Sequence, residues 1–137
     1  MKKLSLKEAA GEFEMINNET HVFYNTETGE FDFYTEFMRY DGEADIDKFD
    51  EDCWIRCPSQ YDIGEYDIMV DFADTVTNPK KNELLSAALE GRGAFRRFKD
   101  TLRRVGLVDE WYEFKNKAYI EIAREWCEDN KLEYVDE

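Results

Sequence analysis

The chain has 137 residues and a formal net charge of −15, with 18 Lys/Arg against 33 Asp/Glu. A hydrophobic content of 42% and an aromatic content of 15% exclude a disordered chain and supply the material of a packed core. No apolar run approaches the roughly 18 residues that cross a bilayer, so we expect no membrane segment.

The first expected element is a helix over about residues 5–15. Ser5 and Glu8 have the spacing of a capping box, and apolar residues follow at helical intervals. The start of the chain is charged and lacks the apolar stretch of a signal peptide, so we assign it to this helix.

A β-hairpin is expected next, because residues 21–25 and 31–34 are rich in strand-forming residues. Gly29 lies in the turn between them, where a positive φ is required. A third strand is expected over 53–57, ended by Pro58.

The acidic connection 41–52 has acids at positions 1, 3, 5, 7 and 12 of a twelve-residue calcium loop. However, Ile46 replaces the glycine of the sharp turn, and Asp52 replaces the usual bidentate glutamate. We therefore expect a solvated acidic loop and no calcium site.

Residues from 62 onward have helical periodicity. We expect Asp62 to cap the first helix, with an apolar stripe made of Ile63, Tyr66, Val70 and Ala73. Pro79 suits the first turn of the next helix, whose expected core residues are Leu84, Leu85, Ala88 and Leu89. Gly91 is the expected stop of that helix.

Two more helices follow, over about 94–105 and from Asp109 onward. Gly106 is expected to end the first, and Asp109 to cap the second. The last helix carries an aromatic face with Trp111, Phe114, Ala118, Ile122 and Trp126. We expect this face to be a packed helix interface.

These elements predict an α+β fold, with an N-terminal helix and a small three-stranded antiparallel sheet packed on a C-terminal bundle of about four helices. We expect a single compact domain over 1–137, with an acidic α/β-hairpin lobe over 1–58 and a helical lobe over 59–137. Residues 1–78 hold 6 Lys/Arg and 20 Asp/Glu, whereas residues 79–137 hold 12 and 13.

The strongest functional signal is a basic segment in this acidic chain. On a helical wheel, Ala94, Phe95, Phe98, Leu102 and Val105 form the inner face of helix 94–105, and the bases point outward. The loop before the helix can bring backbone N–H groups close to an anion. The candidate anion- or partner-binding residues are Gly91, Arg92, Gly93, Arg96, Arg97, Lys99, Arg103 and Arg104.

Several interpretations of this segment stay open. The first is an interaction or regulatory module that docks an acidic protein surface, a phosphorylated ligand or RNA. The second is an enzyme or binding protein for a phosphorylated small molecule, with Arg92 and Arg96 as anion clamps and Asp62 or Glu65 as a base. In a third, the acidic front half imitates nucleic acid. Finally, the bases could simply pair with the protein's own acids.

Catalytic and metal signatures are weak. His21 is the single histidine, and no motif marks a nucleophile for it. Cys53 and Cys57 lie four residues apart in an expected strand, about 13 Å from one another and too far to share a zinc ion. An odd number of cysteines predicts reduced thiols and a cytoplasmic location. We expect no metal and no cofactor, and we lean away from an enzyme.

The segments 58–66, 91–100, 111–114 and 125–127 together resemble an uncharacterised bacterial family, uncharacterised protein family 0158. The likeness covers about 58–130, with the Gly-Arg-Gly block at 91–100 as its most specific part, and reaches the first 57 residues only through the hairpin. It implies a small bacterial cytoplasmic protein with a self-contained α+β unit. It implies no activity, substrate or cofactor.

Overall fold

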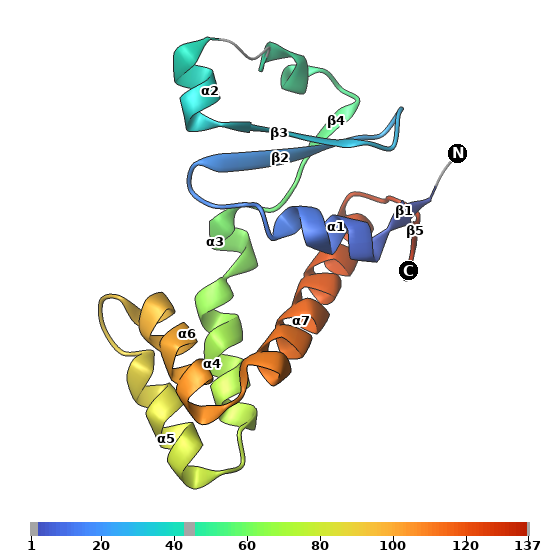
Figure 1. Ribbon diagram of the computed structural model, residues 1–137. Helices are drawn as coiled ribbons and strands as arrows, with labels where there is room; N and C mark the ends of the chain where they lie inside the picture. The colour runs from blue at the N-terminus through green and yellow to red at the C-terminus, as the bar shows by residue number, and fades with distance from the viewer. Residues whose placement is uncertain (1–2, 43–45, 137) are drawn as a thin grey trace. The chain divides into compact units, whose positions relative to one another are not determined.

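Figure 1 shows the computed structural model, in which residues 3–42 and 46–136 are described. The fold is mixed α+β, as predicted, with a three-stranded antiparallel sheet, an N-terminal helix and a helical C-terminal region. The chain divides into two compact units. We call Met1–Ile63 with Tyr119–Glu137 the sheet unit, and Gly64–Ala118 the helical unit.

The sheet unit begins with a short strand and the predicted first helix. Strand β1 (Leu4–Ser5) pairs in parallel with β5 (Tyr134–Val135), with Leu4 opposite Tyr134. Helix α1 (Leu6–Phe13) starts at Ser5, whose hydroxyl accepts a hydrogen bond of 3.2 Å from the Glu8 backbone N–H. The capping pattern in the sequence therefore placed this helix start correctly.

The antiparallel sheet has the strand order β3-β2-β4. The hairpin is β2 (Thr20–Asn25) with β3 (Phe31–Thr35), and β4 (Trp54–Arg56) lies on the other side of β2. Gly29 has a φ of 76° in the hairpin turn. All three predicted strands and the role of the turn glycine are thus confirmed.

The core of the sheet unit is aromatic. Trp126 packs edge-on against Phe13, with ring centroids 5.4 Å apart, and against Tyr24 at 6.0 Å. On another side of β2, the Phe23 ring stacks on Phe49 at 4.3 Å. The alternation of side chains along β2 places Tyr24 and Phe23 on opposite faces, so both faces of this strand are covered.

The connection after β3 contains structure that the sequence did not predict. Helix α2 (Glu36–Asp41) starts at Thr35, whose hydroxyl accepts a hydrogen bond from the Met38 N–H at 3.2 Å. A 3-10 helix, η1 (Asp47–Asp50), precedes β4. Part of the proposed calcium-loop comparison, residues 43–45, lies outside the described residues.

The start of the helical region corrects the prediction that Asp62 is an N-cap. Helix α3 (Gln60–Ile63) is instead capped by Ser59, whose hydroxyl accepts from the Asp62 N–H at 3.1 Å. The Asp62 carboxylate in turn accepts from the Ser59 N–H at 3.1 Å. Asp62 is therefore the third-position partner of a reciprocal cap, which places the true start three residues earlier.

Helix α4 (Glu65–Thr75) follows Gly64, which has a φ of 63°. Its buried residues are Ile68, Met69, Phe72 and Ala73, so the predicted stripe is wrong in including Tyr66 and Val70. Because Gly64 breaks the helix, the phase set by Ile63 does not continue into α4. Tyr66 uses its hydroxyl to donate a hydrogen bond of 2.8 Å to the Leu89 carbonyl oxygen.

Helix α5 (Pro79–Ala88) has proline in its first turn, as predicted, and is capped by Asn78, which accepts from the Lys81 N–H at 3.1 Å. Leu85 and two further expected core residues, Ala88 and Leu89, are buried. Leu84 is wrong as a core residue, since 38% of it is exposed.

Helix α6 (Ala94–Val105) has the predicted bounds and ends at Gly106, which has a φ of 74°. Helix α7 (Val108–Asp129) begins one residue before Asp109, so Asp109 lies in its first turn and is not its cap. The Phe98 and Trp111 rings pack edge to face in the core of the helical unit, with centroids 5.1 Å apart.

Candidate functional site

The basic segment folds as the loop before α6 and the outer surface of α6. Gly91, Arg92 and Gly93 form the loop, and both glycines have a φ of 75°. Ala94, Phe98, Thr101 and Leu102 are buried and fix which side of α6 faces inward. The six bases from Arg92 to Arg104 are all exposed, and we call them the basic face.

Two details of the predicted inner side of α6 are wrong. Phe95 is 41% exposed, and Thr101 is buried in its place. A residue at the border of a helical stripe can turn either way, and here the neighbouring helix α5 covers the Thr101 side. The exposed Phe95 ring consequently lies at the edge of the basic face.

Arg97 differs from the other bases because the chain itself uses its guanidinium group. Its Nε donates to the Ala88 carbonyl oxygen at 3.2 Å, and its two terminal nitrogens donate to the carbonyl oxygens of Glu90 and Arg92. These carbonyls belong to the end of α5 and the following loop, where no helical N–H is available to them. Arg97 therefore fastens the α5–α6 connection.

Carboxylates are scarce around the rest of the basic face. Within residues 64–118, Asp100 is the one acid whose oxygen comes within ion-pair distance of these bases, at 3.7 Å from Arg103. In that same unit, Arg92, Arg96, Lys99 and Arg104 have no carboxylate oxygen within 4.0 Å. These four side chains are exposed to solvent.

The two units differ in charge. The helical unit holds 10 Lys/Arg and 10 Asp/Glu and is formally neutral, whereas the sheet unit holds 8 and 23 and carries the whole charge of −15. Six of the ten bases of the helical unit lie in the thirteen residues from Arg92 to Arg104. The basic face is therefore a local feature of a neutral unit.

A shallow groove of about 540 Å³ runs beside the basic face, between α5 and α6. Leu84, Ala87 and Ala88 form its apolar part, and its polar lining consists of Arg97, Asp100, Thr101 and Arg104. An apolar floor next to cationic side chains suits a partner that presents both an apolar side chain and carboxylates.

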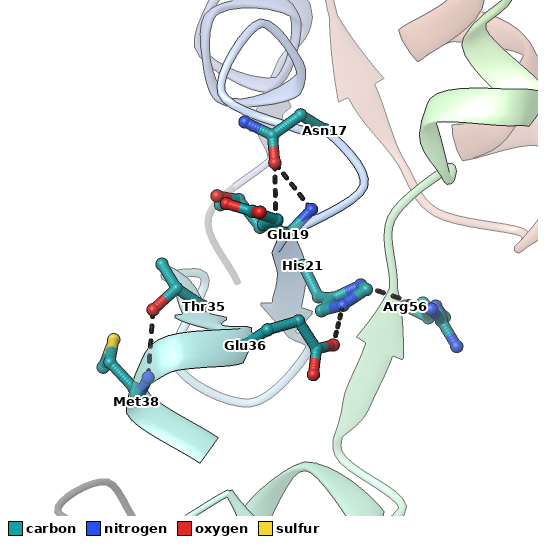
Figure 2. A network of polar contacts seen from close by, with 8 residues as sticks. Asn17, Glu19, His21, Thr35, Glu36, Met38 and Arg56 are labelled. Atoms are coloured by element: carbon teal, nitrogen blue, oxygen red, sulfur yellow. Dashed lines mark hydrogen bonds and ion pairs between the residues drawn. The ribbon is translucent and has the colours of Figure 1, made fainter. Parts of the chain in front are cut away.

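The single histidine has polar partners that no sequence motif indicated. The Nε2 atom of His21, on β2, lies 2.7 Å from a carboxylate oxygen of Glu36, the first residue of α2 (Figure 2). Its Nδ1 atom lies 3.5 Å from a guanidinium nitrogen of Arg56, at the end of β4. The predicted hairpin over residues 21–25 and 31–34 was the available signal, and the register in the structure, with Thr20 opposite Thr35, brings residue 36 close to residue 21.

The three cysteines are free thiols, with Cys57 and Cys127 buried and Cys53 partly exposed. Burial raises the pKa of Cys57 and, with the nearby Glu128 carboxylate, raises the pKa of Cys127 to about 11. Across residues 3–42 and 46–136, no three His, Cys, Asp or Glu side chains gather in a way that could hold a metal ion. Nor does any helix in these ranges have the length and apolarity of a membrane span.

Comparison with known proteins assigns the chain to a family. Residues 30–137 match the model of an uncharacterised protein family, UPF0158, and the chain belongs to that family. The match begins earlier than the region 58–130 in which the resemblance was expected. A UPF0158 protein of Pseudomonas aeruginosa is 34% identical over 67 residues, which span 48% of this chain and 44% of that protein. No solved structure matches the chain.

Proposed function

We propose that this member of the UPF0158 family is an interaction module that docks an acidic protein through the basic face of α6. The observation that carries the proposal is the set of four exposed bases on a formally neutral unit, none of which has a carboxylate within ion-pair distance in residues 64–118. A surface of this kind attracts and orients an anionic partner.

The groove beside α6 favours a protein partner over RNA. Leu84, Ala87 and Ala88 offer an apolar surface for a side chain of the partner, and Arg104, which lines the same groove, can meet a carboxylate. RNA binding depends on many phosphate contacts, and a chain with a net charge of −15 repels a polyanion at long range. An acidic protein segment with an apolar anchor satisfies both parts of the groove.

A binding site for a phosphorylated small molecule at the Gly91–Gly93 loop is the alternative. Arg97 is a weak candidate for binding a phosphate group in this alternative, because its guanidinium group already donates to three carbonyl oxygens of the α5–α6 connection. A Cβ atom added at Gly93 would meet the Arg97 Nη1 at 3.3 Å, so this side chain lies directly against the loop. Arg92 and Arg96 remain the two bases of this alternative.

The same proposal places the protein in the cytoplasm, since its three cysteines are unpaired. The partner is then a protein of that compartment, met at an ionic strength at which charges separated by more than about 8 Å are screened. The acidic groups of the partner must therefore lie within about 8 Å of the bases of the basic face.

The test is a pair of double variants that alter charge equally. Arg96→Glu with Lys99→Glu reverses two bases of the basic face, while Lys80→Glu with Lys117→Glu reverses two exposed bases elsewhere in the helical unit. We expect the first pair to weaken capture of the partner from lysate at least tenfold and the second to leave it unchanged. The captured protein is identified by mass spectrometry and its affinity measured at two salt concentrations.

Thermal melting of the variants shows whether a loss of capture comes from a loss of folding. Exposed substitutions away from packed contacts change the free energy of unfolding by about 0.5 kcal/mol or less. If both double variants lose capture equally, general electrostatics accounts for it and the proposal is wrong. If nuclease treatment of the lysate abolishes capture, the partner is RNA and the acidic-protein assignment fails.

A further inference from the structure

A small pocket of about 230 Å³ lies inside the sheet unit, remote in sequence from the basic face. Three segments form its polar wall: the turn with Asn17 and Asn18, the start of β2 with His21, and the end of β4 with Arg56 and the following Ser59. The pocket is smaller than the roughly 300–1,000 Å³ typical of sites for drug-sized ligands, so it suits a ligand of few atoms.

His21 has a polar partner at each of its two ring nitrogens. Glu36 can only accept, so Nε2 carries the proton that forms the 2.7 Å hydrogen bond. Nδ1 then accepts a hydrogen bond from the Arg56 guanidinium group at 3.5 Å. Among the described residues, other titratable side chains near the ring are Tyr34, with ring centroids 4.9 Å apart, and Cys57 and Tyr61 in the pocket wall.

Arg56 is held in place through its backbone. Its carbonyl oxygen accepts the Trp126 indole N–H at 3.0 Å, and it lies opposite Phe23 in the β2–β4 ladder. Its side chain is exposed, and among the described residues no carboxylate oxygen lies within 4.0 Å of it. What distinguishes Arg56 from other unpaired bases of the unit, such as Arg39, is its place in the pocket wall, 3.5 Å from His21, where its guanidinium group can meet an anion.

We propose that this pocket binds the phosphate group of a small phosphate monoester, with Arg56 and His21 as its two charged ligands. On binding, Arg56 donates to phosphate oxygens, and Nδ1 of His21 takes up a proton and donates to another. Glu36 keeps its hydrogen bond to Nε2 and balances the imidazolium charge. The Asn17 and Asn18 amides and the Ser59 hydroxyl offer neutral donors from other sides of the pocket.

The donor arrangement favours phosphate over carboxylate. Arginine alone can hold a planar carboxylate through two parallel hydrogen bonds. Here the donors come from three separate segments, which matches a tetrahedral group with several oxygens. A dianion also supplies the charge that makes protonation of His21 favourable.

Calorimetric titration of the full chain tests the proposal at about pH 8, above the ordinary histidine pKa of about 6.5. The probes are glycerol 3-phosphate, inorganic phosphate and acetate, each in two buffers of different ionisation enthalpy. We expect the monoester to bind at least tenfold more tightly than acetate and to take up close to one proton. Inorganic phosphate distinguishes a site for the free ion, because tighter binding of inorganic phosphate than of the ester overturns the monoester assignment.

Variants locate the site. Arg56→Gln should weaken binding of glycerol 3-phosphate at least tenfold, and His21→Gln should abolish proton uptake. Arg39→Gln is the matched control, because Arg39 is another exposed arginine of the sheet unit without a carboxylate within 4.0 Å among the described residues. Lys99→Gln on the basic face should also leave binding unchanged, which separates this site from the docking surface.

The proposal is wrong if none of the probes binds, if Arg39→Gln weakens binding as much as Arg56→Gln, or if His21→Gln leaves proton uptake intact. Amide proton spectra of Arg56→Gln and His21→Gln show whether each variant keeps the native fold. A folded Arg56→Gln variant that binds the monoester normally also overturns the proposal.

Discussion

The helical unit and the sheet unit differ in net charge, yet both pair some of their bases and leave others unpaired. The neutral helical unit pairs Lys115 with Glu65 at 3.0 Å, and the acidic sheet unit pairs Lys48 with Asp32 at 2.5 Å and Arg124 with Asp136 at 2.7 Å. Among the described residues, the sheet unit also has exposed bases with no carboxylate oxygen within 4.0 Å, such as Lys7, Arg39, Arg56 and Lys131. The comparison teaches that an abundance of acids does not by itself pair a base, and that the net charge of the chain describes only one of its units.

The largest effect is expected from the core of the helical unit, on which the display of the basic face depends. Phe98 is fully buried and its ring lies against Phe72 and Trp111. Phe98→Ala should lower the free energy of unfolding by about 3–5 kcal/mol in urea titrations. Phe95→Ala, at the exposed edge of the same helix, is the control and should cost far less. Equal losses would mean that the inner side of α6 is assigned wrongly.

A smaller loss is expected for Arg97→Ala, which separates a structural base from the displayed ones. It removes three hydrogen bonds to carbonyl oxygens at the end of α5 and in the loop, and should cost about 1–2 kcal/mol because the site is largely solvated. Arg96→Ala removes a neighbouring base without such contacts and should change stability by no more than about 0.5 kcal/mol. Thermal melting of the two variants is the measurement, and indistinguishable curves would contradict the fastening role of Arg97.

The buried thiols of the sheet unit predict a loss of stability at alkaline pH. Burial and Glu128 raise the pKa of Cys127 to about 11, above the roughly 8.5 of an unfolded chain. The unfolded state therefore releases this proton first, so the contribution is complete below about pH 8.5 and is lost as the pH rises toward 11, by at most about 1.4 kcal/mol per pH unit. Urea titrations across this range should show a shallower decline for Cys127→Ala, and an unchanged slope would exclude this thiol as the cause.

The smallest effect is expected from salt, and it should distinguish the two units directly. Self-repulsion among the 23 acids of the sheet unit weakens with screening, whereas the neutral helical unit has little net repulsion to relieve. Hydrogen exchange at low and high NaCl should show amides of β2 and β3 gaining a few tenths of a kcal/mol of protection, about the size of weak surface charge effects. Amides of α5 should change less, and a uniform response would contradict the contrast in charge.

The sequence was most informative where local chemistry decides the structure. Ser5 marked the start of α1, Gly29 the hairpin turn and Gly106 the end of α6, because caps and positive φ angles depend on a few adjacent residues. Helix α2 was missed because its six residues have no buried side chain and therefore no periodic apolar signal. The helix is capped by Thr35, which is also the last residue of β3, so no turn residues in the sequence separate the strand from the helix.

Tertiary context decided the rest. Gly64 interrupts the helix before α4 and changes which face of α4 is buried. Ile68 is therefore a core residue of α4, whereas the expected core residue Tyr66 is not. The roles of Arg97 and His21 depend on carbonyl oxygens and side chains up to 35 residues away, as in the contact of His21 with Arg56. The basic face was predictable from the sequence as a charged stripe on a helix. The sequence did not indicate which of its bases makes hydrogen bonds within the chain.

The division of the chain has a consequence for synthesis on the ribosome. The helical unit is one continuous segment, but the sheet unit is closed by residues 119–137, including Trp126 and strand β5. During vectorial synthesis the helical unit can fold as soon as residue 118 has emerged, while α1 and the hairpin wait for the indole that packs against Phe13 and Tyr24. The most acidic part of the protein is thus the last to mature, and a nascent chain stalled before residue 119 would present helices without a finished sheet.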